Sequence, residues 1–296
     1  MKSLLIGIFI VVSAPLLASE ADHSISTIVI PYMEVNASHR LYTDHLLAKA
    51  MEASVDKYGP YKIVQQEQSS VLKRHLLDLE KGSISVATSM PIPEWMDNAL
   101  AVRIPLMKGL ASYRLFLGGK KHWQDFDKVK KLADLKRFNI GQGDGWSTGK
   151  ILEDNGFNVV YGPSSTLLAM LEANRFQLLM RGIFEAKPDL AAQQKSTPEL
   201  LLVDQFAVYT YLPMYFFVGK DKPELAGRLE YGLKKLHASG QMDALFNAYF
   251  ADDLKLLNNK KTKVFYINNT NIDPSFFEHD KPYLLESIVK LEKKRH

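Results

Sequence analysis

A glycine-rich string in the middle of the chain holds the most distinctive residues for binding chemistry. Residues 141–150 read GQGDGWSTGK. Glycines let a backbone approach a ligand closely, and a turn that enters a helix offers free N–H groups and a partial positive charge to an anion. Ser147 and Thr148 are placed either to cap such a helix or to bind a ligand. A tight connection between a strand and a helix that binds nothing is the alternative.

Two nucleotide-binding patterns are excluded for this string. A phosphate-binding P-loop would need glycine at Asp144 and serine or threonine at Ile151. The dinucleotide pattern would need glycine where Trp146 stands. The string therefore suits a small anionic group better than a nucleotide.

Arg181 is the second candidate for an anion contact. It follows an apolar segment and precedes Gly182, so we expect it at the end of a strand. An arginine can hold a carboxylate or a phosphate through two parallel hydrogen bonds. Glu185 is one turn further along, either as a partner for Arg181 or as a contact for a ligand amine. A surface salt bridge between the two is the alternative.

Several catalytic chemistries lack their residues. The absence of cysteine excludes disulfides, thiolate metal sites and a cysteine nucleophile. The eight histidines show no metal-binding spacing, so we expect isolated surface residues and no metal or cofactor. The Gly-x-Ser-x-Gly pattern of hydrolases is absent, and the neighbouring Asp252 and Asp253 point apart on a helix. The net charge of +4 is too small to indicate nucleic-acid binding. We therefore expect the protein not to be an enzyme.

Strand-like and helix-like segments alternate along the chain. This order favours parallel strands covered by helices. It occurs in two β-α-β-α-β units joined by extended segments, which predicts two α/β lobes with a ligand cleft between them. We expect strands at 27–30, 61–64, 84–87, 138–140, 158–161 and 177–180, and helices at 41–57, 70–79, 148–154, 166–174, 223–237 and 241–257.

Other candidates lie near the expected cleft. Trp95 and Trp146 fall in opposite lobes, where two aromatic faces can hold a ring or a flat cation between them. Tyr32 follows the first strand and Ser89 ends the third. Ordinary packing is the alternative for the aromatic residues. Arg103 and Arg114 lie in extended segments near the first crossing between lobes.

The ordered set of local strings resembles the type II periplasmic solute-binding proteins, and among them the family 3 branch that includes polar amino acid receptors of ABC importers. The strings are 27–32, 82–88, Ile104-Pro105, 140–143 and 145–148. The resemblance implies a first lobe of residues 20–115 and 209–296, a second lobe of residues 116–208, and closure about a hinge. It covers nearly the whole chain after the N-terminal segment.

The chain departs from those receptors at two positions. They place an arginine after the third strand to hold the ligand carboxylate, whereas this chain reads Ile92-Pro93-Glu94-Trp95. They place an aspartate late in the second lobe to hold the ligand amino group, whereas this chain reads Leu179-Met180-Arg181-Gly182. The resemblance therefore does not imply a standard α-amino acid as the ligand.

The N-terminal residues 1–19 are typical of a signal peptide. Lys2 precedes an apolar run over residues 4–17, and the small residues Ala18, Ser19 and Ala21 follow. The run is shorter than the roughly 20 residues that span a bilayer. An uncleaved anchor is the alternative. A lack of cysteine excludes a lipid-modified cysteine and fits a free protein of the bacterial periplasm better than a secreted eukaryotic protein.

These observations predict an exported solute-binding protein that acts as a monomer. We expect it to capture a small polar ligand by lobe closure, with an anionic group on Arg181 and the Ser147–Thr148 turn, and to present it to a membrane permease. The alternative is a periplasmic signalling or interaction protein with a degenerate pocket, which acts on a membrane sensor.

Overall fold

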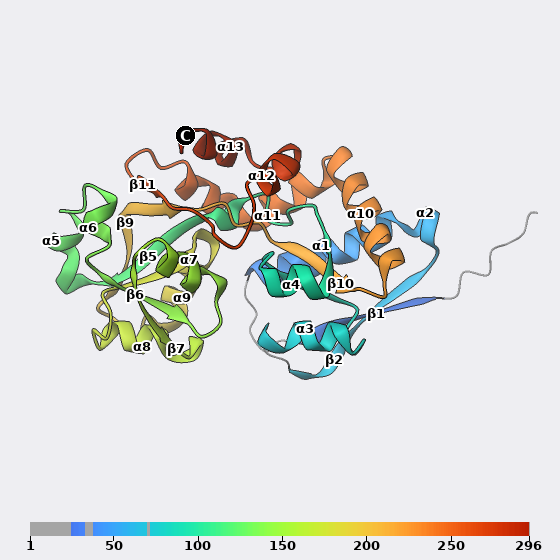
Figure 1. Cartoon of the computed structure of the whole chain (residues 1–296), viewed down its shortest axis with the longest axis horizontal. Helices are drawn as coiled ribbons and strands as arrows, with labels where there is room; N and C mark the ends of the chain where they lie inside the picture. The colour runs from blue at the N-terminus through green and yellow to red at the C-terminus, as the bar shows by residue number, and fades with distance from the viewer. Residues whose placement is uncertain (1–24, 33–37, 70–71, 296) are drawn as a thin grey trace, which may run out of the picture.

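The computed structural model describes residues 25–32, 38–69 and 72–295. The expected signal peptide, residues 1–19, lies outside them. Two α/β lobes stand side by side (Figure 1). The predicted two-lobed α/β fold is therefore confirmed, whereas the exact lobe boundaries stay a prediction.

The first lobe is built on two small sheets, a parallel pair β1-β2 and an antiparallel sheet in the order β3-β10-β4. Helix α1 packs against α10 and α11. The elements of this lobe are β1 (Ser26–Tyr32), α1 (Ser38–Ala53), α2 (Val55–Tyr58), β2 (Tyr61–Ser69), α3 (Leu72–Glu80), β3 (Val86–Ser89), α4 (Pro93–Asn98), β4 (Ala99–Val102), β10 (Tyr215–Gly219), α10 (Pro223–Ala238) and α11 (Gln241–Leu257).

The second lobe has one six-stranded sheet in the order β11-β9-β5-β8-β6-β7. Parallel pairs join β6 to β7 and to β8, as the alternating pattern predicts, and antiparallel pairs join the crossing strand β5 to β8 and β9. Its elements are β5 (Tyr113–Gly119), α5 (Trp123–Phe126), α6 (Leu132–Leu135), β6 (Asn139–Gly143), α7 (Ser147–Asp154), β7 (Asn158–Gly162), α8 (Leu167–Glu172), β8 (Leu178–Gly182), α9 (Ile183–Gln193) and β9 (Leu200–Tyr209). Short 3-10 turns are η1 (Leu110–Ser112), η2 (Lys120–His122) and η3 (Ser164–Thr166).

The C-terminal residues form more structure than the sequence predicted. From Lys260 onward the sequence predicts one short strand at 264–267 and then a solvated basic end. The chain instead forms β11 (Lys263–Tyr266), α12 (Ser275–Asp280), a 3-10 turn η4 (Lys281–Tyr283) and α13 (Glu286–Lys293). Strand β11 pairs with β9 of the second lobe, although it falls in the range expected for the first lobe. In Figure 1 this segment, coloured red, runs along the edge that both lobes share.

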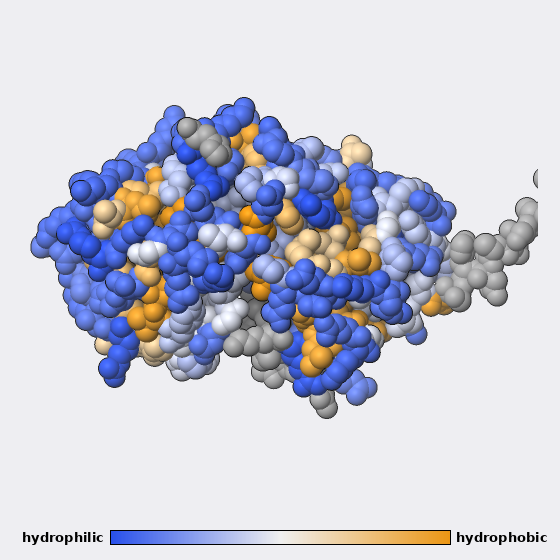
Figure 2. Space-filling model, in the orientation of Figure 1, coloured by the Kyte–Doolittle hydropathy of each residue, from blue (hydrophilic) through white to orange (hydrophobic). Residues whose placement is uncertain are grey.

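One buried apolar cluster continues from the first lobe into the second. It joins Leu46 of α1 and Phe250 of α11 to Phe184 at the start of α9. The rings of Phe184 and Phe250 lie 6.0 Å apart. The outer surface seen in Figure 2 is largely hydrophilic, with smaller apolar areas over both lobes. The lobes are thus held together by apolar packing as well as by the chain crossings.

The contact between α10 and α1 generates a stability prediction. A methyl group on Gly232 would collide with the Ala50 carbonyl oxygen, and backbone cannot move aside cheaply. We expect Gly232→Ala to lower the free energy of unfolding by about 2 kcal/mol, despite the better helix propensity of alanine.

Gly227→Ala in the same helix is the matched control. Its added methyl group would meet the Tyr58 hydroxyl at 3.4 Å, an ordinary contact. We expect no loss and up to about 1 kcal/mol of gain from helix propensity. Urea unfolding measures both variants, and equal losses in the two would contradict the close packing.

Candidate functional site

Arg181 and Trp146 form the centre of the candidate site. Arg181 lies at the carboxyl end of β8, and its side chain is 13% exposed. Its guanidinium lies over the ring of Trp146, 4.5 Å from the ring centroid. Trp146 precedes α7, and a side chain on Gly143 would collide with its ring, so glycine at that position lets the ring lie against β6. The stacked pair places a cation and an aromatic face side by side.

Two carboxylates on α9 neutralise Arg181. Arg181 Nε lies 2.5 Å from Asp189 Oδ2, and Nη2 lies 3.3 Å from Glu185 Oε1. Residues four apart lie on one face of a helix, so Glu185 and Asp189 both face β8. The Gly182 N–H also donates to Glu185 Oε2, at 2.7 Å. The expected partnership of Arg181 with Glu185 is present, and Asp189 is a partner that sequence reasoning missed.

Arg114 is a second buried arginine in the same cluster. It is 3% exposed and lies opposite Gly182 in the pairing of β5 with β8. Its Nη2 lies 3.6 Å from Glu185 Oε2. Burial lowers the pKa of Arg114 to about 10, although Glu185 opposes this shift. Burial acts to raise the pKa of Glu185, but Arg181 and Arg114 outweigh it and lower the pKa to about 2. Glu185 is therefore ionised and shared by two arginines.

His39 brings the first lobe to this cluster. It lies in the first turn of α1, and its ring is 5.2 Å from the ring of Phe184. Burial lowers the pKa of His39, so the ring is neutral at pH 7, although nearby Glu185 opposes the shift. We expected isolated surface histidines; this is wrong for His75, which is buried, and His39 is half-buried. No spacing in the sequence signals His39, because its neighbours come from the other lobe.

The turn before α7 holds the two predicted hydroxyl residues in different ways. Ser147 Oγ lies 3.2 Å from the sulfur of Met90, which follows β3 in the first lobe. Thr148 is buried, and its hydroxyl donates to Gln142 Oε1 at 2.5 Å. Neither side chain caps the helix. The Thr148 hydroxyl is therefore engaged within the second lobe.

Within the part of the chain that the structure describes, the recorded ion pairs and ring contact of Arg181 do not include Tyr32, Ser89 or Trp95. Tyr32 ends β1 and is 38% exposed. Ser89 ends β3, and its hydroxyl donates to the Met90 carbonyl oxygen at 3.3 Å. Trp95 is 8% exposed and packs edge-on against Phe217, with ring centroids 5.0 Å apart. Among the described residues, no recorded contact joins Trp95 to Trp146 or Arg181.

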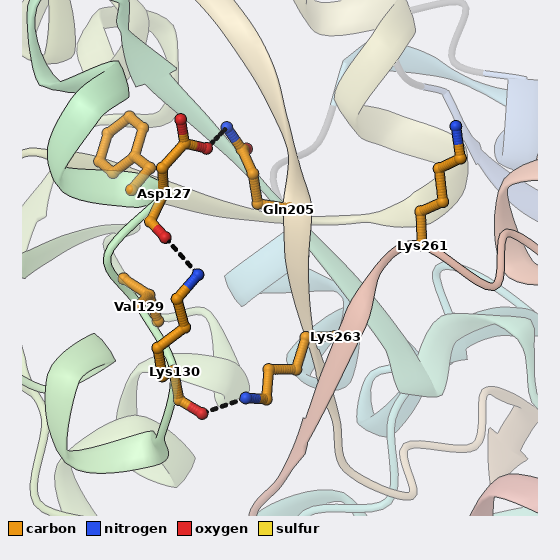
Figure 3. Close-up of a pocket in the computed structure, with 7 residues that line it drawn as sticks. Asp127, Val129, Lys130, Gln205, Lys261 and Lys263 are labelled. Carbon is orange, nitrogen blue, oxygen red and sulfur yellow. Dashed lines mark hydrogen bonds between the residues drawn. The ribbon is translucent and has the colours of Figure 1, made fainter.

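A separate basic hollow lies on the second lobe, between the loop after α5, the edge strand β11 and its neighbour β9 (Figure 3). Its volume is about 340 Å³. Lys130 Nζ donates to the Asp127 carbonyl oxygen, and Lys263 Nζ donates to the Lys130 carbonyl oxygen. Two of its three ammonium groups are thus engaged by backbone, which favours a structural role. The lining residues are Phe126, Asp127, Val129, Lys130, Gln205, Lys261 and Lys263.

Within residues 25–32, 38–69 and 72–295, no cluster of His, Asp or Glu could hold a metal ion. Over those same residues, none of the helices has the length and apolar character needed to cross a membrane.

The sequence matches no protein-family model and no curated protein. Solved structures do match. An ancestral arginine-binding protein bound to glutamine has a TM-score of 0.57 and 17% identity, over 77% of this chain and 99% of that one. A protein from a study of glutathione import by GshT and the cystine ABC importer TcyBC of Streptococcus mutans has a TM-score of 0.56 and 14% identity, over 77% and 96%.

The chain has the two-lobed fold of these proteins. A histidine kinase sensor domain similar to periplasmic binding proteins also matches, with a TM-score of 0.53 and 13% identity, over 77% of this chain and 96% of that one. The type II periplasmic-binding-protein fold expected from the sequence is thus confirmed. Nearly a quarter of the chain has no counterpart in these structures. The first 24 residues account for only part of this unmatched share, so some of the described residues are also unmatched.

The shared carboxylate generates a prediction of pH-dependent stability. At pH 7 we expect Glu185→Gln to lower the free energy of unfolding by about 3 kcal/mol, because it leaves Arg114 buried without a counter-charge. Glu185 has a lower pKa in the folded chain than in the unfolded chain. The contribution of Glu185 to the free energy of unfolding is therefore complete above the pKa that Glu185 has in the unfolded chain. It is lost as the pH falls toward the pKa of about 2 in the folded chain.

Urea unfolding from neutral to acidic pH measures this difference between wild type and Glu185→Gln. Glu278→Gln is the control, because Glu278 is a 67% exposed residue whose pair with Lys281 is worth little. A Glu185→Gln loss that stays constant with pH would contradict the assignment.

Proposed function

We propose that this chain is an exported solute-binding protein that takes a small polar ligand between its lobes. The observation that supports this most directly is the position of Arg181 and Trp146. They lie at the carboxyl end of β8 and the start of α7, and His39 and Met90 of the other lobe meet the same region. Ligands of α/β proteins bind beyond the carboxyl ends of strands and between domains.

The proposed ligand carries an anionic group. Nε and Nη2 of Arg181 are engaged by α9, and among the described residues Nη1 has no recorded hydrogen-bond partner. An anion at this edge would also face the N–H groups that begin α7. The Ser147–Thr148 turn thus contributes backbone, with Trp146 as the apolar wall.

Asp189 would compete with the ligand for Arg181. Its side chain is 32% exposed, and burial raises its pKa against the opposing effect of Arg181. Glu185 is held more firmly, because it also contacts Arg114 and the Gly182 N–H. A ligand anion would therefore displace Asp189 and leave Glu185 in place. A bound ligand would then shift the population toward the form in which the lobes are closed. A membrane permease would recognise that closed form.

A thermal-shift panel tests the binding site. The probes are L-amino acids, glutathione and small dicarboxylic acids. A solute at about 100 times its dissociation constant should raise the melting temperature by about 5 °C. We expect Arg181→Ala to abolish that rise. Arg137→Ala, at a 71% exposed arginine of the same lobe, should keep it.

Asp189→Asn tests the competition directly. If Asp189 occupies Arg181 in the free protein, then its removal should tighten binding of the stabilising solute, as measured by calorimetry. An affinity that falls in Asp189→Asn would show that Asp189 contacts the ligand and would overturn this part of the proposal. Unchanged binding in Arg181→Ala would overturn the anion site itself.

A signalling or interaction protein that acts on a membrane sensor is the second candidate function. It is supported by the balance of charge at the site, where two carboxylates already neutralise two arginines. The fold of a histidine kinase sensor domain is also similar. No melting shift with any solute, together with cross-linking to a membrane sensor, would favour this candidate.

A further inference from the structure

We propose that the C-terminal residues 259–295, here called the strap, tie the two lobes together and fix the angle between them. The inference deepens the proposed function, because it concerns the movement of the same two lobes. The strap would hold the lobes at the observed angle without a solute, so that it sets how far the site opens.

One end of the strap is attached to the second lobe. Strand β11 adds to the edge of the sheet, with Lys263 opposite Phe206 and Tyr266 opposite Tyr209. Phe265 is buried, and its ring centroid lies 6.4 Å from that of Phe206. This attachment consists of backbone pairing and apolar burial, so the strap does not slide along the lobe.

The strap then contacts both ends of α7. Asn155 Nδ2 donates to the Asn268 carbonyl oxygen at 2.8 Å, and the Asn268 N–H donates to Asn155 Oδ1 at 3.0 Å. The Thr270 hydroxyl donates to Asp154. At the other end of the helix, Asn271 Nδ2 donates to the Ser147 carbonyl oxygen at 3.5 Å. The helix that begins at the proposed site is therefore bound to the strap at both of its ends.

The carboxylate of Asp280 binds the strap to buried residues at the point where the chain returns to the first lobe. The Asp280 side chain is fully buried, and it accepts hydrogen bonds from the Tyr211 hydroxyl at 2.7 Å and from the Tyr215 hydroxyl. Burial raises the pKa of both tyrosines, so they remain protonated donors. Arg103 Nη2 lies 3.9 Å away as a counter-charge. A buried carboxylate without such partners would be costly, so this contact specifies one position for the strap.

The strap ends on the first lobe. The ring of Tyr283 lies 4.8 Å from that of His237 on α10, and the Leu285 N–H donates to the Lys108 carbonyl oxygen at 3.0 Å. Ile288 is buried against Gly109, where an added methyl group would approach its side chain to 2.8 Å. The φ of Gly109 is +79°, a conformation that suits glycine.

The strap is therefore a further connection beside the two chain crossings. A change of lobe angle must break the contacts of Asn268 and Thr270 with α7 or the buried contacts of Asp280. The contacts of Asn268 and Thr270 are exposed to solvent, whereas the contacts of Asp280 are buried. The α7 end of the strap would give way first when the lobes move.

Distance measurements between two spin labels test the proposal without any solute. The chain has no cysteine, so Lys128→Cys and Lys234→Cys introduce only the two wanted label sites. These positions are 70% and 56% exposed and lie on the second and the first lobe. Two variants release the strap. Asn155→Ala with Thr270→Ala acts at the exposed end, because the Asn155 side chain makes both hydrogen bonds to the Asn268 backbone and the Thr270 hydroxyl makes the bond to Asp154. Asp280→Asn acts at the buried end. Asp252→Asn, at an 84% exposed residue elsewhere, is the control.

We expect one narrow distance in the wild type and in Asp252→Asn, and a longer, broader distribution in both strap variants. Circular dichroism confirms that each variant is folded, and the exposed variant keeps the test valid if Asp280→Asn does not fold. A broad wild-type distribution, or a narrow one that the exposed variant leaves unchanged, would overturn the proposal. Because no solute is added, a failure of solute binding would leave this result standing.

Discussion

The buried contact of Arg114 with Glu185 is the constraint on which the arrangement of the second lobe depends. A buried guanidinium needs a counter-charge within reach, because charge in a low-dielectric interior is costly. Glu185 satisfies this need from the first turn of α9, across the strand pair β5 and β8. The position of α9 relative to the sheet is thus set by charge as well as by apolar packing.

Arg181 and the first lobe follow from that contact. Because Glu185 is fixed by Arg114 and the Gly182 N–H, it holds Arg181 against Trp146 at the strand end. The same helix start places Phe184 against Phe250 of the first lobe. The position of the proposed site and the contact between lobes therefore share one structural cause. The strap acts on this arrangement from outside, through α7.

Much of the fold could be predicted because its signals are local. Apolar periodicity located the helices now called α1, α10 and α11, and the β-α-β order predicted the parallel pairs. Arg181 and Glu185 were found from a strand end and a one-turn spacing. Asp189, His39 and Arg114 were missed as members of one cluster, because helix packing and strand pairing bring them together and no sequence spacing records it. The strap was not predicted, because the residues that hold it are far apart in the sequence. Asp280 and Tyr211, for example, are separated by 69 positions.

The measurement that tests the central claim most directly is the fluorescence of Trp146 as the sole tryptophan. The chain has three tryptophans, so Trp95→Phe with Trp123→Phe leaves Trp146 alone beside Arg181. The protein is titrated with L-amino acids, short peptides and carboxylic acids. Solute binding between the lobes predicts a saturable change in Trp146 emission that Arg181→Ala removes. Binding that calorimetry detects while Trp146 emission stays constant would contradict the account.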